Sequence, residues 1–114
     1  MSIHDTRRAP RRPAASGVPV VDVMTGDAIG QLGNLSESGL LLLGATELCE
    51  DALYQLDFPL GGEGRPISVG PHLLWSAPAS TPGQAWYGFR FLTISEAHRA
   101  RVRTWVAAGG GGTG

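Results

Sequence analysis

GNLSESGLLLLG, residues 33–44, places a short polar segment directly before four consecutive leucines. The leucines predict a short, fully buried strand, because a brief apolar run bounded by glycines leaves no polar face for water. Residues 28–35, AIGQLGNL, are typical of another strand that glycines loosen. The polar segment therefore connects two strands.

Further short strands are predicted on either side of this stretch. Residues 18–25 come before it, and residues 53–58, 66–76 and 85–92 follow it. Turns recur about every ten residues, and the 17 glycines and 8 prolines favour turns over long helices. Pro71 predicts a bulge or bend in its strand. The sequence thus predicts an all-β fold, a small antiparallel barrel or sandwich.

The C-terminal part has a helical pattern instead. Thr93 or Ser95 can cap the start of this helix. Arg99 and Arg103 share one face, which we expect to meet solvent, and Gly109 predicts the helix end. Three side chains at helical spacing form an apolar face: Val102, Trp105 and Val106.

A chain of 114 residues is long enough for one domain. We expect a flexible, arginine-rich arm over residues 1–16, the barrel and its helix over residues 17–108, and a disordered glycine-rich tail over residues 109–114. Cys49 is the single cysteine, so no disulfide framework is expected, and we predict that it is buried. No secretory signal and no apolar run of membrane-spanning length are visible, which predicts a cytoplasmic protein without membrane insertion.

The charge is divided unevenly along the chain, although the net charge is only −1. Residues 1–16 carry four arginines against one aspartate, residues 17–98 two arginines against nine acidic residues, and residues 99–108 three arginines. A protein that binds long nucleic acid is normally basic over a whole face. Two basic patches on an acidic body favour one small anionic ligand instead.

Two short motifs carry the groups that such a ligand needs. Residues 7–12, RRAPRR, contain two pairs of arginines at i and i+4, and arginine can bind phosphate or the guanine edge through two parallel hydrogen bonds. Asn34, Ser36 and Gly39 offer an amide, a hydroxyl and a backbone that a ligand can approach closely. A turn held by local side-chain hydrogen bonds is the alternative explanation of the second motif.

The order of these motifs resembles the PilZ domain family, whose signature is RxxxR followed by [D/N]xSxxG. Later residues fit the same family, because Trp75 ends a strand, Gly88, Phe89 and Phe91 lie in the segment WYGFRFL, and a helix follows. The resemblance spans roughly residues 7–107. It implies a six-stranded antiparallel β-barrel with a helix at one end, and binding of the bacterial second messenger cyclic di-GMP.

The resemblance also assigns ligand-binding residues. The set comprises Arg7, Arg8 and Arg12 of the arm and Asn34, Ser36 and Gly39 of the second motif, with Arg11 and Trp75 as additional candidates. We prefer Arg8 and Arg12 as the RxxxR pair, and the register Arg7–Arg11 stays open. Asn34 stands where aspartate is commoner, and its single acceptor oxygen is expected to change the affinity.

The implied function is that of a receptor or adaptor without catalysis, cofactor or metal. Cyclic di-GMP is expected to fold the arm onto the barrel, and an unidentified protein partner to recognise the change. The scattered histidines show no metal or catalytic pattern, and GGEG, residues 61–64, is no phosphate-binding loop. Three alternatives stay open: a PilZ-like adaptor in type IV pilus assembly that does not bind the nucleotide, a small barrel for single-stranded nucleic acid, and a purely structural interaction module.

Overall fold

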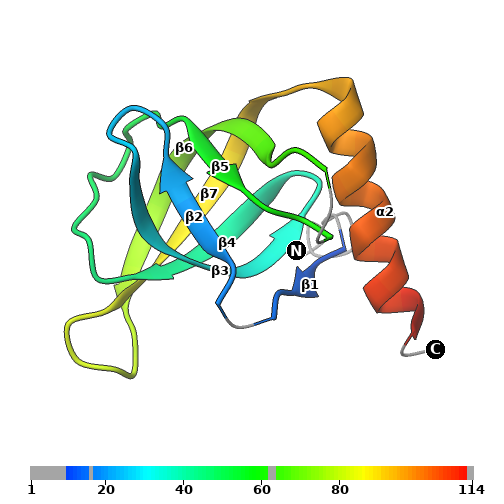
Figure 1. The fold of residues 1–114 in the computed structure, drawn as a ribbon. Coiled ribbons are helices and arrows are strands. Elements are labelled where there is room, and N and C mark those ends of the chain that lie inside the picture. Colours follow the sequence, from blue (N-terminus) through cyan, green and yellow to red (C-terminus); the bar gives the residue numbers. More distant parts are fainter. Residues whose placement is uncertain (1–9, 16, 62–63, 113–114) are drawn as a thin grey trace, which may run out of the picture.

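The computed structural model describes residues 10–15, 17–61 and 64–112. These residues form seven strands and one helix (Figure 1). Their bounds are β1 (Arg12–Pro13), β2 (Pro19–Asp22), β3 (Asp27–Ser36), β4 (Gly39–Gly44), β5 (Leu56–Phe58), β6 (Ile67–Pro78), β7 (Ala85–Ile94) and α2 (Glu96–Gly112).

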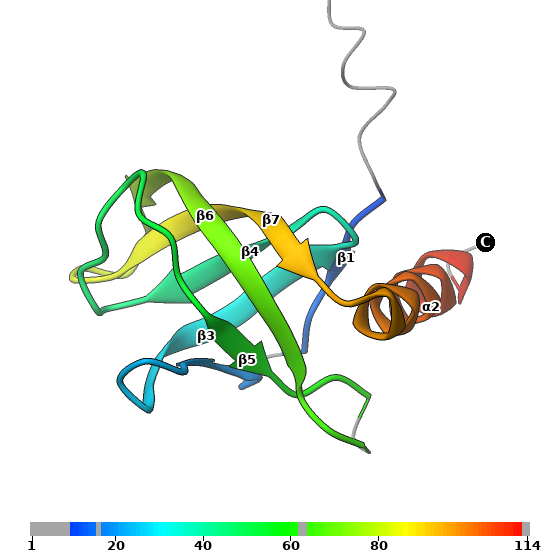
Figure 2. The same ribbon diagram turned by 90° about the horizontal axis from the view of Figure 1, so that it is seen from above.

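Six of these strands close into an antiparallel barrel. The order around it is β3-β2-β5-β6-β7-β4, and a second pairing of β3 with β4 joins the two ends. The extra strand β1 pairs with the far end of β3, beyond the part that β2 occupies. Seen from above, β1 lies between the barrel and α2 (Figure 2). The predicted six-stranded barrel with a C-terminal helix is confirmed, and β1 is an addition to it.

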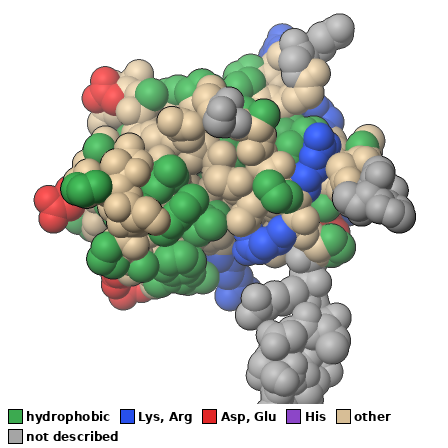
Figure 3. Space-filling model, turned by 90° about the horizontal axis from the view of Figure 1, so that it is seen from below, with side chains coloured by type: hydrophobic (Ala, Val, Ile, Leu, Met, Phe, Trp, Pro, Cys, Tyr) green, Lys and Arg blue, Asp and Glu red, His purple; other side chains and the backbone are tan. Residues whose placement is uncertain are grey.

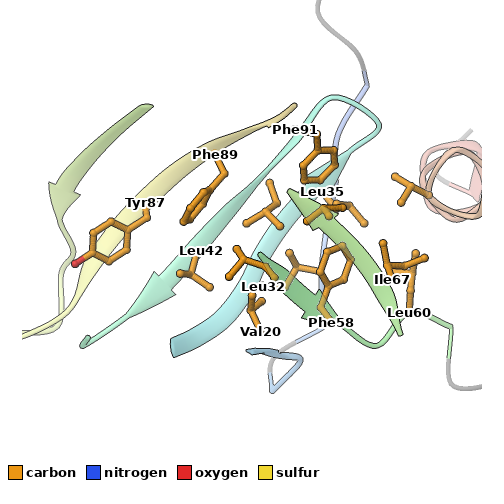
Figure 4. Close-up of a cluster of buried hydrophobic side chains, with 14 of the residues drawn as sticks. Val20, Leu32, Leu35, Leu42, Phe58, Leu60, Ile67, Tyr87, Phe89 and Phe91 are labelled. Carbon is orange, nitrogen blue, oxygen red and sulfur yellow. The ribbon is translucent and has the colours of Figure 1, made fainter. Parts of the chain in front are cut away.

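One hydrophobic core fills the barrel and continues to the helix (Figure 4). Alternate residues of the strands point inward, so that Leu40 and Leu42 of β4 are buried next to Phe89 of β7. Val102 and Val106 of α2 belong to the same core, and Trp105 packs against it. The apolar helix face read from the sequence is therefore the face that docks α2 on the barrel.

The two ends of α2 differ in how well the sequence predicts them. Ser95, rather than Thr93, caps the start, because its Oγ accepts a hydrogen bond from the backbone N–H of His98 at 3.1 Å. The helix continues to Gly112, so the predicted end at Gly109 is wrong. Glycine lowers helix stability but does not block the next hydrogen bond, so a glycine run need not end a helix. The disorder of the tail stays a prediction.

Elsewhere in the chain, one bulge lies where the sequence predicted it, and two features differ from the prediction. β6 has a register shift between Gly70 and Pro71, as expected from the proline. β5 covers only the second half of the strand predicted over 53–58. Cys49 is exposed, contrary to the prediction, because it lies in the β4–β5 connection on the surface. Among the helices in the described part of the chain, none has the length and apolar character needed to cross a bilayer.

Candidate ligand-binding site

The barrel closure aligns four residues of four strands on its outer surface. Asn34 of β3 pairs with Leu41 of β4, Leu41 with Gly88 of β7, and Gly88 with Trp75 of β6. All four line a cavity of about 230 Å³, which Arg11 borders as well. Residues far apart in the sequence thus form one continuous site floor, hereafter the Asn34–Trp75 row.

Trp75 supplies an accessible aromatic surface at one end of this row. Its relative exposure is 45%, because a second register shift in β6 adds one residue between Leu73, which is buried, and Trp75, which then lies on the outer face. The indole lies against the backbone of Gly88, where a Cβ atom would collide with it. A stack on an exposed indole is a common way to hold a nucleobase. Trp75 therefore lines the cavity with an exposed ring, and its contact with a ligand stays a prediction.

A second tryptophan lies over a glycine on the same outer surface. A Cβ atom on Gly33 would be 2.9 Å from Cζ3 of Trp86, so the indole covers this glycine closely. Gly33 is also where the register of β3 against β4 shifts, directly before Asn34. The sequence motif did not reveal this packing, since Trp86 and Gly33 are joined only through the β3–β4–β7 sheet.

Arg11 holds the other end of the row. Its Nη1 donates a hydrogen bond to Oδ1 of Asn34 at 2.7 Å. The contact arises because Arg12 and Pro13 of β1 pair with Leu35 and Asn34 of β3. An arginine and an amide therefore meet at the cavity, and the arginine is the additional candidate Arg11.

Arg12 lies elsewhere, against the helix. Its Nη1 donates to the backbone carbonyl of Trp105 at 2.8 Å, and its Cζ is 4.0 Å from the centre of the Trp105 ring. Arg7 and Arg8 lie outside the described residues. The two arginines of the arm that the structure describes thus lie in different places: Arg11 borders the cavity, and Arg12 contacts α2.

Ser36 and Gly39 shape the turn after β3. Ser36 is fully buried, and its Oγ accepts hydrogen bonds from the backbone N–H groups of Ser38 and Gly39, both at 3.2 Å. Gly39 lies so close to β7 that a Cβ atom would collide with the carbonyl of Phe89. In this structure both residues have the local turn role that the sequence offered as the alternative for the motif, and Asn34 alone faces the cavity.

Two of the three arginines of α2, Arg99 and Arg103, contact this same turn. Arg99 Nη1 donates to the Glu37 carbonyl at 3.3 Å, and Arg103 Nη2 lies 3.1 Å from Glu37 Oε1. Arg103 is exposed as expected, whereas Arg99 is half-buried, and Glu37 within the turn is the partner of both. The turn thus contacts both the barrel and the helix. Within the described ranges, no three histidine, cysteine or acidic side chains are grouped to hold a metal.

The fold and the site together define a small barrel with a polar and aromatic surface pocket beside an arginine-bearing arm. The PilZ domain family matches residues 5–108, so the chain belongs to this family. No curated protein matches the sequence significantly.

Two solved structures share the fold. One is the Bacillus subtilis inhibitor of motility MotI/DgrA, with a TM-score of 0.75 and 12% identity over 90% of this chain and 49% of that chain. The other is the PilZ domain of YcgR from Escherichia coli with c-di-GMP, with a TM-score of 0.66 and 17% identity over 94% of this chain and 93% of that chain. The chain thus spans about half the length of the first structure.

Proposed function

We propose that this protein is a receptor for cyclic di-GMP that transmits the binding event to a protein partner in the bacterial cytoplasm. The observation that carries the proposal is the meeting of Arg11, Asn34 and Trp75 in one surface cavity. Membership of the PilZ family supports it, and so does the c-di-GMP in the structure of the YcgR domain. PilZ domains are binding and adaptor modules, and the proposal includes no catalytic step.

The chemistry of the cavity suits a guanine dinucleotide. A guanidinium can pair with a phosphate or with O6 and N7 of guanine, and an amide can hydrogen-bond the base edge. An exposed indole offers a stacking surface for a purine. We assign these roles to Arg11, Asn34 and Trp75, respectively, while Ser36 and Gly39 hold the turn that presents Asn34.

The arm supplies the remaining positive charge in this proposal. The position of Arg11 beside Asn34 supports the register Arg7–Arg11 for the RxxxR pair, with Arg8 and Arg12 as the neighbouring pair. Figure 3 shows that arginine side chains gather on one side of a molecular face, next to an apolar area, while acidic side chains lie mostly at the opposite edge. An anion approaching this face is attracted toward the side with the arginines and repelled from the acidic edge.

The proposal is tested by isothermal titration of cyclic di-GMP into the purified protein near physiological salt. We expect saturable binding, with GMP and cyclic di-AMP binding far more weakly. Arg11→Ala and Asn34→Ala should each lower the affinity at least tenfold. Arg65→Ala is the matched control, because it removes an exposed arginine that does not line the cavity.

Absence of cyclic di-GMP binding by the wild-type protein would refute the receptor proposal. It would favour the PilZ-like adaptor that works without the nucleotide. An equal loss of affinity in Arg11→Ala and Arg65→Ala would show that net charge, rather than this cavity, attracts the ligand.

A further inference from the structure

We propose that Trp105 of α2 competes with the ligand for Arg12, so that binding of cyclic di-GMP moves Arg12 away from the helix. Trp105 is then a positioning residue that lowers the affinity of a site it does not touch. This inference rests on the proposed function and adds a route by which the ligand acts on the C-terminal helix.

Arg12 is held to α2 by three separate contacts. Its Nη1 bonds the Trp105 carbonyl at 2.8 Å, and its guanidinium carbon lies 4.0 Å from the centre of the indole ring. Its aliphatic stem crosses the helix at Gly109, where a Cβ atom would collide with it. An arginine over a partly buried indole gains cation–π and packing energy together. The position of Arg12 in this structure is therefore specific.

Arg12 directly follows Arg11, which borders the ligand cavity. Arg11 bonds Asn34, and Pro13 pairs with Asn34 in the sheet. Neighbouring side chains of an extended chain point to opposite sides, and Arg11, directly before β1, faces the cavity while Arg12 faces the helix. β1 has only two residues and two pairs with β3, so little sheet pairing opposes a change that redirects Arg12.

The charges favour such a change when a ligand arrives. Cyclic di-GMP brings two phosphates to a cavity where Arg11 is the bordering arginine among the described residues. At the helix, Arg12 has an aromatic ring and a neutral carbonyl as partners. A phosphate forms stronger, charge-assisted hydrogen bonds with a guanidinium than a carbonyl does. The ligand therefore offers Arg12 a better partner than α2.

The helix as a whole stays attached when Arg12 leaves. Arg101 bonds the carbonyls of Arg65 at 2.6 Å and Leu60 at 3.1 Å, and Val102 and Val106 remain in the core. Only the surface around Trp105 and Gly109 loses its cover. The ligand signal thus appears on the C-terminal half of α2.

The first test uses Trp105→Leu, which keeps an apolar side chain on the core but removes the ring. Because coupling between two sites is reciprocal, loss of the competing partner should tighten cyclic di-GMP binding, by roughly 3- to 30-fold in isothermal titration. The same substitution in an Arg12→Ala background should leave the affinity unchanged. Thr104→Ala, an exposed neighbour on α2, is the control and should bind as the wild type does.

An unchanged or weaker affinity of Trp105→Leu, or an equal change in both backgrounds, would overturn the inference. The second test does not depend on the folding of this variant. In NMR spectra of the wild-type protein, the indole N–H signal of Trp105 should shift on addition of cyclic di-GMP and should stay in place in Arg12→Ala with ligand.

The proposed function and this inference fail in different ways. No binding of cyclic di-GMP by the wild-type protein would remove both. Saturable binding without any response of Trp105 would leave the receptor function intact and refute the competition for Arg12 alone.

Discussion

Two glycines, Gly39 of β4 and Gly88 of β7, show how single residues can serve either the fold or the site. A Cβ atom on Gly39 would meet the backbone carbonyl of Phe89, whereas one on Gly88 would meet the indole of Trp75. A backbone strand in a closed barrel cannot move aside, but an exposed side chain can. Gly39 is therefore required for closure, and Gly88 for the position of the indole.

We expect Gly39→Ala and Gly88→Ala to separate stability from binding. Gly39→Ala should lower the free energy of unfolding by about 3 kcal/mol, measured by urea denaturation, because β4 and β7 must separate. Gly88→Ala should cost about 1 kcal/mol but weaken cyclic di-GMP binding about tenfold, because Trp75 is displaced. A Gly88→Ala protein that binds normally would contradict the stacking role of Trp75.

Ser36→Ala should reduce stability by about 2 kcal/mol, because two backbone N–H groups in the turn lose their acceptor. Ser38→Ala is the matched control, since Ser38 is exposed and should change the free energy of unfolding by less than about 0.5 kcal/mol. Thermal or urea unfolding without ligand measures both. Equal stabilities would mean that the Ser36 hydroxyl does not hold the turn.

At the level of elements, α2 is attached to the barrel at several points along its length. Val102 and Val106 enter the core, Arg101 bonds two carbonyls near the β5–β6 connection, and Arg103 pairs with Glu37 of the turn. The arm strand β1 then reaches the same helix through Arg12. The helix is therefore the element on which the arm, the turn and the barrel converge.

Arg101→Ala should loosen α2 more than Arg103→Ala does. Arg101 donates to two carbonyls, whereas Arg103 makes an exposed ion pair of the kind that contributes little. Amide hydrogen exchange should accelerate severalfold in the helix of Arg101→Ala and change little in Arg103→Ala. The reverse order would show that the turn, rather than the β5–β6 connection, is the main attachment of the helix.

For the molecule as a whole, positive and negative charges are concentrated in different parts of the chain. The arm and helix carry most of the arginines, while the barrel between them is acidic. Such a distribution attracts a small anion to one place and disfavours a long polyanion lying across the surface. The whole protein is then suited to a compact, doubly charged ligand.

Ligand binding should stabilise the whole domain against heat. Because the ligand binds the folded state, a concentration of one hundred times Kd adds about 2.7 kcal/mol. For a domain of this size that raises Tm by about 10 °C or more, measured by scanning calorimetry. Cyclic di-AMP at the same concentration should cause a much smaller shift, and equal shifts would refute selectivity for guanine.

Much of the fold was predictable from the sequence, because strands, turns and the helix depend on local patterns. The apolar run of β4, the bulge at Pro71 and the apolar face with Val102 and Val106 all follow from neighbours in the chain. The family motif also identified Asn34 as a site candidate. The short β5 and the exposed Cys49 differ from prediction because long-range pairing and loop position decide them.

The sequence by itself determined which residue types are available for binding, and the tertiary structure decided which of them meet. The Asn34–Trp75 row exists only because the barrel closes in one register, bringing four strands together. The sequence placed Arg12 in the preferred pair and Arg11 among the additional candidates, yet Arg11 bonds Asn34 and Arg12 bonds α2. An extended chain directs neighbouring side chains to opposite sides, and only the packed barrel and helix define what lies on each side.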